Sequence, residues 1–316
     1  MSAAVVTFGE TMALFRPTDP AEGENATDYR LSFGGAESNV AVGVARLGGR
    51  AVWMGRLGDD VAGRRICREL RAEGVELRVT VDAEASTGSM MKTEIAPGRV
   101  GVQYWRAGSA GSRLHPDDLD LAPLTPATVL HVTGITPALS ASASTAVDAA
   151  MSAARAAGAT VSFDVNHRPS LWRGRDASAV YRRLAAQSDM VFAGREEAAL
   201  LVGERPDDEL MDAIAALGPS TVALKRGADG ATVLAEGRLL HRPAWPIHPV
   251  DTVGAGDAFV AGYLAESLRG APLESRIDTA VAAGAFACLG RGDWESLPHR
   301  RQLELLAAGD GDPVVR

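Results

Sequence analysis

The sequence predicts an α/β fold in which a mostly parallel sheet is covered by helices on both faces. Two observations lead to this prediction. Short apolar runs of strand length alternate with segments of helical spacing, and many of the helical segments end at Gly or Asn/Asp-rich turns. Repeated strand–helix–strand units build a parallel sheet. The 316 residues contain no linker or internal repeat, so we expect a single domain over 1–316.

The sequence predicts the strands and helices of the α/β body at definite positions along the chain. Buried apolar runs predict core strands at 5–9, 51–55, 129–133, 160–165, 190–193 and 221–225. Helical spacing predicts helices at 38–47, 63–73, 142–157, 177–187 and 196–201. A hairpin over 232–235 and 238–242 is followed by helices at 255–268, 277–289 and 300–308.

Two stretches, about 12–33 and 87–106, interrupt the alternation. They hold β-type runs at 12–16, 89–95 and 100–105 with no helix between them. We expect these runs to form a small antiparallel sheet inserted into the α/β body. Ligands of open α/β folds bind at the carboxyl edge of the sheet, where such an insertion would act as a lid.

Composition excludes several classes of partner. The net charge is −8 without a basic cluster, which argues against nucleic acid and anionic membrane surfaces. Cys67 and Cys288 are far apart and fit no metal-ligand spacing, so we expect reduced thiols in a cytoplasmic protein. No leader-like segment and no apolar run of about 18–20 residues suited to a membrane span is found. Of 32 basic residues, only Lys92 and Lys225 are lysines.

The strongest chemical signal is the segment DTVGAGD at 251–257, which runs into an apolar helix. Small residues at a loop-to-helix junction leave backbone N–H groups bare, and these groups together with the helix dipole bind anions. Asp257 would then lie beside a bound phosphoryl group, where it can accept the proton of an attacking hydroxyl. By itself the segment fits a glycine-rich turn capped by Asp257 equally well.

A second glycine-containing segment, FGGAESN at 33–39, also precedes a predicted helix. Glycine allows a ligand to approach the backbone closely, and the Asn39 amide can bind hydroxyls as donor and acceptor. Taken alone, this segment fits an ordinary turn with a capping residue. Together, the two segments resemble the GG-x-x-x-N and D-T-x-G-A-G-D signatures of the PfkB/ribokinase family of carbohydrate kinases. The resemblance covers nearly the whole chain and implies a ribokinase-like three-layer α/β/α sandwich with a small β lid.

The resemblance implies roles for residues that match the family's motifs. Asp257 would be the catalytic base, with Gly254, Ala255 and Gly256 as the anion hole. Gly34, Gly35 and Asn39 would contact the substrate. The turn at Lys225 and Gly227, together with Gly254 and Gly256, would bind the nucleotide. The implied cofactors are ATP and Mg²⁺, and analogy of fold implies a homo-oligomer.

One family element departs from its pattern. The family has an Asn-x-x-Glu segment associated with Mg²⁺ and phosphate, and the matching segment here is GREE at 194–197. Glu197 matches and would be the metal residue. Gly194 stands in place of the Asn, so the role of this element is left open.

Two further segments bear on the substrate. VQYWRAGSA at 102–110 and DVNHRPSLW at 164–172 each place an arginine at the expected ligand edge, and an arginine fork suits a carboxylate. Ordinary surface arginine is the alternative. The two segments resemble those of 2-keto-3-deoxygluconate kinases, Y-x-R-x-G-S-A and D-x-N-Y-R-x-x-L-W, although Met90 and His167 stand where that group has Tyr. That resemblance implies that four residues hold the substrate: Tyr104, Arg106, Arg168 and Asp293.

The expected activity is therefore ATP-dependent phosphorylation of the terminal hydroxyl of 2-keto-3-deoxygluconate. A fructokinase-like or ribokinase-like kinase for a neutral sugar, and a non-catalytic sugar-acid-binding protein, are the alternatives. The six histidines show no metal-ligand spacing, and neither lysine belongs to a Walker A motif. A dehydrogenase would need Gly-x-Gly-x-x-Gly after an early strand, which this sequence lacks.

Overall fold

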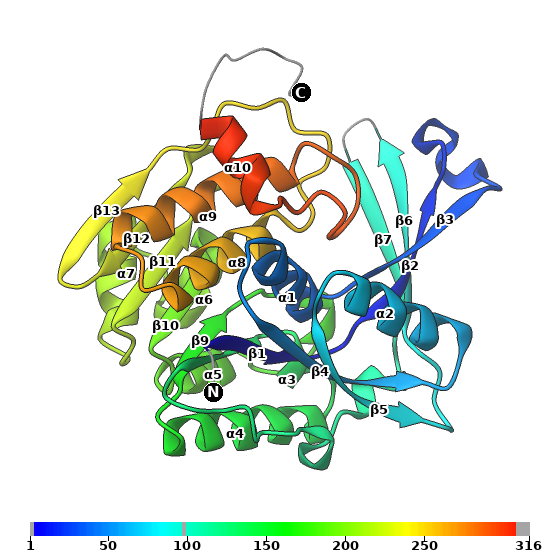
Figure 1. Cartoon of the computed structure of the whole chain (residues 1–316), viewed down its shortest axis with the longest axis horizontal. Coiled ribbons are helices and arrows are strands. Elements are labelled where there is room, and N and C mark those ends of the chain that lie inside the picture. The colour runs from blue at the N-terminus through cyan, green and yellow to red at the C-terminus, as the bar shows by residue number, and fades with distance from the viewer. Residues whose placement is uncertain (1–2, 97–98, 308–316) are drawn as a thin grey trace.

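The computed structural model describes residues 3–96 and 99–307, and its centre is a nine-stranded sheet (Figure 1). The strand order is β13-β12-β11-β10-β9-β8-β1-β4-β5. The strands from β11 to β5 are parallel: β1 (Ala4–Phe8), β4 (Ala51–Gly58), β5 (Glu76–Asp82), β8 (Thr128–Thr133), β9 (Thr160–Asp164), β10 (Met190–Gly194) and β11 (Thr221–Lys225). The hairpin of β12 (Ala231–Ala235) and β13 (Arg238–Arg242) adds antiparallel strands at one edge.

Helices cover both faces of this sheet. One apolar core joins the sheet to α4 (Ala141–Ala156), α5 (Ala177–Ala185), α6 (Arg195–Val202) and α7 (Asp207–Ala215). A second core joins the other face to α1 (Ala36–Arg46), α2 (Val61–Ala72), α8 (Ala255–Leu268) and α9 (Leu273–Ala287). Along β1, Val6 and Phe8 belong to the first core and Val5 to the second, as the alternation of a strand requires. The predicted three-layer α/β/α architecture is confirmed.

The remaining helices are short or terminal. They are α3 (Thr136–Leu139), α10 (Arg300–Ala307) and 3-10 turns at Pro20–Asn25, Gly111–Arg113, Pro116–Asp118, Pro169–Leu171 and Gly227–Asp229. Ala308 of the predicted last helix lies outside the described residues, as do residues 97 and 98 of the predicted lid. Among the helices that are described, none is both long and apolar enough to cross a membrane.

A second, four-stranded sheet projects from one end of the central body (Figure 1). Its order is β3-β2-β6-β7, made of β2 (Met12–Pro17), β3 (Tyr29–Gly34), β6 (Ser89–Ala96) and β7 (Arg99–Trp105). The expectation of a purely antiparallel sheet is wrong, because β2 pairs with β6 in parallel. Between β2 and β6 the chain passes through β3, α1, β4, α2 and β5, so no tight turn constrains the relative direction of the two strands.

Four strands and helices were not anticipated from the sequence: β3, β5, α7 and the four-residue α3. β5 reads ELRVTVD, lies at the sheet edge and is mostly only partly buried, so it shows no continuous apolar run. β3 reads YRLSFG, whose alternating Tyr, Leu and Phe carry a strand period that could have been recognised. α7 is a nine-residue helix that opens with three acidic residues, and only three of its side chains are buried.

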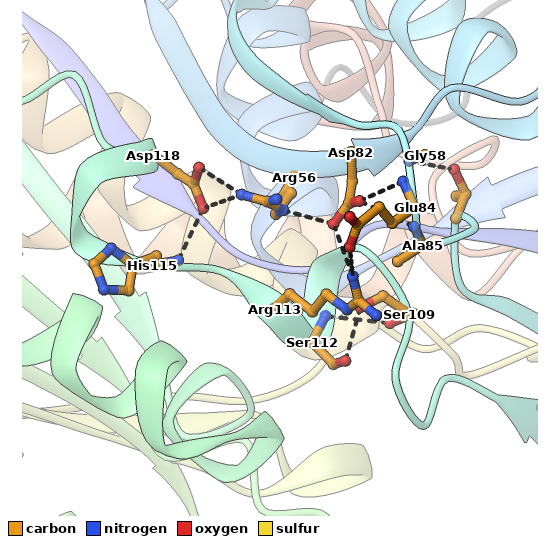
Figure 2. A network of polar contacts seen from close by, with 11 residues as sticks. Arg56, Gly58, Asp82, Glu84, Ala85, Ser109, Ser112, Arg113, His115 and Asp118 are labelled. Atoms are coloured by element: carbon orange, nitrogen blue, oxygen red, sulfur yellow. Dashed lines mark hydrogen bonds and ion pairs between the residues drawn. The ribbon is translucent and has the colours of Figure 1, made fainter.

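The connection from β5 to β6, at the base of the four-stranded sheet, is held by a buried carboxylate (Figure 2). Asp82 Oδ1 accepts hydrogen bonds from the amides of Glu84 and Ala85, both at 2.9 Å. Its Oδ2 accepts from Arg56 Nε at 2.9 Å, and Arg56 Nη1 also donates to Asp118 Oδ1 at 3.0 Å. The backbone donor of Ala85, aided by Arg56, lowers the pKa of Asp82 to about 2. We call these five residues the Asp82 network.

Candidate active site

A cleft of about 890 Å³ opens at the carboxyl ends of the central strands, beneath the four-stranded sheet. The body contributes Asp164 from β9 and Lys225 from β11, and the sheet contributes Met12, Met90 and Tyr104 from β2, β6 and β7. Parallel strands bring their carboxyl ends to one edge, so residues distant in sequence meet there. The cleft is therefore lined by both units.

The glycine turn before α8 borders this cleft. Gly254 has φ 82°, a left-handed conformation, and an added Cβ would overlap the backbone oxygen of Asp293. α8 begins at Ala255, and both Gly254 and Gly256 line the cleft, although Ala255 does not. The first N–H groups of this 14-residue helix thus lie beside the cleft with no bulky side chain in front of them.

Asp257 lies one residue further into α8 and its residue surface is 8% exposed. Oδ2 accepts a hydrogen bond from Asn39 Nδ2 at 2.8 Å, and Oδ1 accepts from Asn166 Nδ2 at 3.3 Å. Burial raises the pKa of Asp257 to about 7, and nearby Asp164 acts in the same direction, while the Asn39 bond opposes both. The carboxyl group therefore changes its protonation state near neutral pH.

Asn39 and Asn166 approach Asp257 from different elements. Asn39 lies in the first turn of α1, and its Oδ1 is buried without a hydrogen-bond partner in the described structure. Buried polar atoms are normally hydrogen-bonded, and Asn39 lines the cleft. A ligand hydroxyl bound there would supply the donor that Asn39 Oδ1 lacks. Asn166 follows β9 with φ 37°, a conformation that Asn tolerates better than most residues. Asn166 was not predicted as a site residue.

Lys225 brings a positive charge to the glycine turn. Its ammonium bonds Asp164 Oδ1 at 2.7 Å, and a Cβ on Gly256 would lie 3.6 Å from Nζ. Burial alone would lower the pKa of Lys225, but Asp164 and Glu197 outweigh it, so the net shift is upward and the lysine stays charged. Arg226 lines the same end of the cleft, whereas the predicted Gly227 does not.

Glu197 links the end of β10 to the segment that follows β9 through two hydrogen bonds. Its Oε2 accepts a hydrogen bond from the Gly194 amide at 2.7 Å, and its Oε1 accepts from the His167 amide at 2.8 Å. Within residues 3–96 and 99–307 no group of three or more acidic, His or Cys side chains is arranged to hold a metal ion. Mg²⁺ often binds through one or two carboxylates together with substrate phosphates, and Glu197 in this cleft fits that kind of site.

The two predicted substrate arginines lie in the same cleft in different states. Arg106 donates from Nε to Glu10 Oε2 at 2.8 Å, and its guanidinium lies 5.5 Å from the ring centre of Tyr104. Arg168 is exposed and donates to the His167 carbonyl. It forms no direct ion pair in the described part of the chain, although its charge acts at longer range to lower the pKa values of Asp257 and Asp164. Arg106 is thus fixed in orientation, whereas the Arg168 guanidinium is available to an anion.

The early glycine pair and Asp293 meet at the junction of sheet and body. A Cβ added at Gly34 would overlap the Asp293 carboxylate and the end of Met90. A Cβ at Gly35 would crowd the backbone oxygen of Glu10. Asp293 and Gly35 line the cleft, while Gly34 lies behind the Asp293 carboxylate and does not. The glycines therefore permit close packing of backbone and side chains at this junction.

Several buried polar or charged residues of the site were not predicted: Glu10, Glu37, Lys92, Asp164 and Asn166 supplement the predicted set. Glu37 is an example. Its Oε1 accepts hydrogen bonds from the hydroxyls of Thr133 and Thr136 at 2.6 and 2.7 Å, and burial raises its pKa. A charged residue at or close to the end of a buried strand or glycine pair was the available signal for Glu10, Glu37 and Asp164. Lys92 lies within β6, and only the rarity of lysine in this chain marks it.

Comparison with known proteins gives a consistent result. Residues 2–300 match the family model described as pfkB family carbohydrate kinase. A 2-dehydro-3-deoxygluconokinase of Bacillus subtilis (strain 168) is 38% identical over 310 residues, covering 96% of this chain and 95% of the relative. A 2-dehydro-3-deoxygalactonokinase of Haloferax volcanii is 34% identical over 313 residues, covering 98% of each.

The fold also matches solved structures. A putative ribokinase II from E. coli, in complex with ATP and Mg²⁺, superposes with a TM-score of 0.89. The match covers 98% of this chain and 99% of that chain at 23% sequence identity. This likeness shows that the chain has a ribokinase-like fold.

Proposed function

Because this chain belongs to the pfkB family of carbohydrate kinases, we propose that it transfers the γ-phosphoryl group of ATP to the terminal hydroxyl of 2-keto-3-deoxygluconate. This compound is also called 2-dehydro-3-deoxygluconate, the sugar acid in the name of the Bacillus relative. The observation that carries the proposal is the shared cleft of Asp257, Arg106 and Arg168. It combines a base for a hydroxyl with two cations for a carboxylate.

Asp257 would act as the general base. A buried carboxyl with a pKa of about 7 is largely ionised just above neutral pH, yet basic enough to take a proton from a hydroxyl as the new bond to phosphorus forms. The amides of Asn39 and Asn166 hold both of its oxygens in place. The unpartnered Asn39 Oδ1 would accept a hydrogen bond from a sugar hydroxyl, which places the sugar next to the base.

The other end of the cleft would hold the nucleotide phosphates. The N–H groups of Gly254, Ala255 and Gly256 and the Lys225 ammonium supply positive charge where the transferred phosphoryl group gains negative charge. Gly227, in the turn after Lys225, would support the nucleotide. Mg²⁺ brought by ATP would be held by the phosphates and Glu197, and when bound it neutralises phosphate charge.

The substrate end favours an acid over a neutral sugar. Arg168 makes no direct ion pair among the described residues, so its guanidinium is open to a bidentate contact with a substrate carboxylate. Arg106 is held by Glu10, and Tyr104 lies beneath it at the cleft wall. Asp293, with Gly34 and Gly35 next to it, would bind sugar hydroxyls.

Three further hypotheses follow from this assignment and concern the lid, the oligomeric state and the cellular location. The four-stranded sheet would close over the sugar as a lid formed by about 12–33 and 87–106. A homo-oligomer in the cytoplasm acting on a small sugar acid and ATP is the expected working form. Each of these is a proposal that rests on the fold and on the residues of the cleft.

A coupled ADP-release assay tests the substrate. 2-keto-3-deoxygluconate, its C4 epimer 2-keto-3-deoxygalactonate, fructose and ribose are compared with Mg–ATP at equal concentrations. The sugar acids should be turned over with far higher kcat/KM than the neutral sugars. The ratio of kcat/KM for the two epimers shows whether the protein prefers the sugar acid named for the Bacillus relative or the one named for the Haloferax relative. Turnover of fructose or ribose without turnover of either acid would refute the assignment. Binding of an acid without ADP release would indicate a non-catalytic protein.

A further inference from the structure

Lys92 is a buried cation of the four-stranded sheet that no role above accounts for. It lies on β6, lines the cleft and is one of only two lysines in the chain. Its side chain is 5% exposed. The ammonium pairs with the Asp293 carboxylate and lies 3.9 Å from Asp251 Oδ2. Both acids belong to the body, so this ion pair joins the sheet to the body.

Asp293 is where three parts of the site meet. One carboxylate oxygen receives Lys92, while the other lies over Gly34, where an added Cβ would overlap it. The backbone oxygen of Asp293 abuts Gly254 of the glycine turn in the same way. The side chain therefore lines the sugar end of the cleft, and the main chain supports the phosphate end.

The loop that carries Asp293 is anchored independently of Lys92, to α1 of the body and to β3 of the four-stranded sheet. Arg46 Nη1 on α1 donates to the carbonyls of Trp294, Glu295 and Leu297 at 3.2, 3.2 and 2.6 Å. The Trp294 ring stacks on Phe33 with ring centres 4.6 Å apart. The backbone of the loop is thus held without Lys92, whose contact is with the Asp293 side chain.

Asp251 gives the same ammonium a second carboxylate at the start of the glycine turn. Asp251 Oδ1 accepts a hydrogen bond from the Val253 amide at 3.0 Å. Burial raises the pKa of Asp293, and Lys92 counteracts that rise. A buried carboxylate that loses its cation is strongly destabilised or takes up a proton. Asp293 would then stop being an anionic acceptor for sugar hydroxyls.

We propose that Lys92 is a positioning residue that makes Asp293 a competent sugar ligand only while the four-stranded sheet is docked on the body. The proposal rests on the proposed sugar-binding role of Asp293. In it, docking brings the ammonium to Asp293 and leaves the carboxylate oxygen above Gly34 free for a hydroxyl. The sugar and the docked sheet then stabilise each other through this buried ion pair, which acts beside the Phe33–Trp294 stack and the Ser32–Glu295 hydrogen bond that also join the sheet to the loop.

A double-mutant cycle tests this coupling with Lys92→Met, Asp293→Asn and the double variant, using whichever sugar the panel shows to be turned over. Lys92→Met should lower kcat/KM for the sugar at least about tenfold, as loss of one partner of a buried ion pair does. The KM for ATP should hardly change. In the Asp293→Asn background, Lys92→Met should cost about threefold or less, because its partner is already neutral. Lys92→Arg should restore most of the sugar kcat/KM.

Exposed Arg64 on α2, whose side chain is 63% exposed and outside the cleft, gives the matched control Arg64→Met. An equal loss from Lys92→Met in both backgrounds would overturn the proposal, as would equal losses in the sugar and ATP constants. If Lys92→Met fails to fold, Lys92→Gln enters the same cycle, with the same readings. Because the sugar is chosen by assay, a wrong substrate assignment leaves this test intact.

Discussion

Asp257 in the cleft and Asp82 in the Asp82 network are both nearly buried, with 8% and 3% of their surface exposed. Their pKa values nevertheless move in opposite directions, to about 7 and to about 2. Asp82 accepts two backbone N–H groups and the Arg56 guanidinium (Figure 2). Asp257 accepts only neutral side-chain amides, from Asn39 and Asn166.

The difference shows why one buried carboxylate stabilises the fold while the other can take part in proton transfer. Burial penalises the charged form of both, but a cation and two amides more than compensate at Asp82. At Asp257 the compensation is incomplete, since Lys225 is bonded to Asp164 and not to Asp257 itself. Asp82 therefore keeps its charge and holds the connection from β5 to β6. Asp257 is left ready to exchange a proton.

The largest expected effect separates the two residues directly. Asp257→Asn should lower kcat by at least ~10²-fold, the scale of losing a general base, while leaving ATP affinity measured by calorimetry unchanged. Asp82→Asn, the matched change in the other region, should leave kcat almost unchanged. A near-normal kcat in Asp257→Asn would show that Asp257 is not the general base and that the two carboxylates do not differ in this way.

Arg168→Ala should raise KM for the sugar acid by about 10- to 100-fold, the loss expected for a hydrogen bond to a charged group. Its effect on a neutral substrate, or on an analogue without the carboxylate, should be much smaller. Exposed Arg173 does not line the cleft, so Arg173→Ala controls for removal of a nearby charge. Equal losses on acidic and neutral substrates would argue against carboxylate recognition.

The pH dependence of kcat/KM sharpens the comparison further. The base form of Asp257 exists above its pKa of about 7, so kcat/KM should fall about tenfold per pH unit as the pH drops below that value. Initial rates between pH 8 and 5.5 with saturating Mg–ATP measure this limb. A profile that stays flat down to pH 5.5 would show that no carboxyl with this pKa acts as the base.

Asp82 should affect stability instead. Asp82→Asn should lower the free energy of unfolding by about 2 kcal/mol at neutral pH, through loss of charged hydrogen bonds. The folded pKa of about 2 is below the ordinary 3.8, so this stabilisation is full above 3.8 and is lost as the pH falls towards 2. Denaturant unfolding of both proteins at pH 7 and pH 2.5 measures it. A difference that does not shrink in acid would contradict the account.

Much of the fold followed from local sequence patterns. The predicted helix at 255–268 matches α8, and the apolar runs at 160–165 and 221–225 fall on β9 and β11, because buried strands and capped helices leave strong signals. β5 escaped prediction because an edge strand needs no apolar run, and the parallel pairing of β2 with β6 depends on contacts that no local pattern encodes.

The sequence by itself determined the glycine segments, the position of Asp257 behind one of them, and the succession of most strands and helices along the chain. Only the tertiary structure decided which side chains meet there: Asn39 reaches Asp257 across 218 positions, Lys92 reaches Asp293 across 201, and Arg106 reaches Glu10 across 96. Charge, burial and donor geometry at such meeting points set the pKa values. They arise from the packing of distant segments, so the chemistry of the cleft emerges only when the chain is folded.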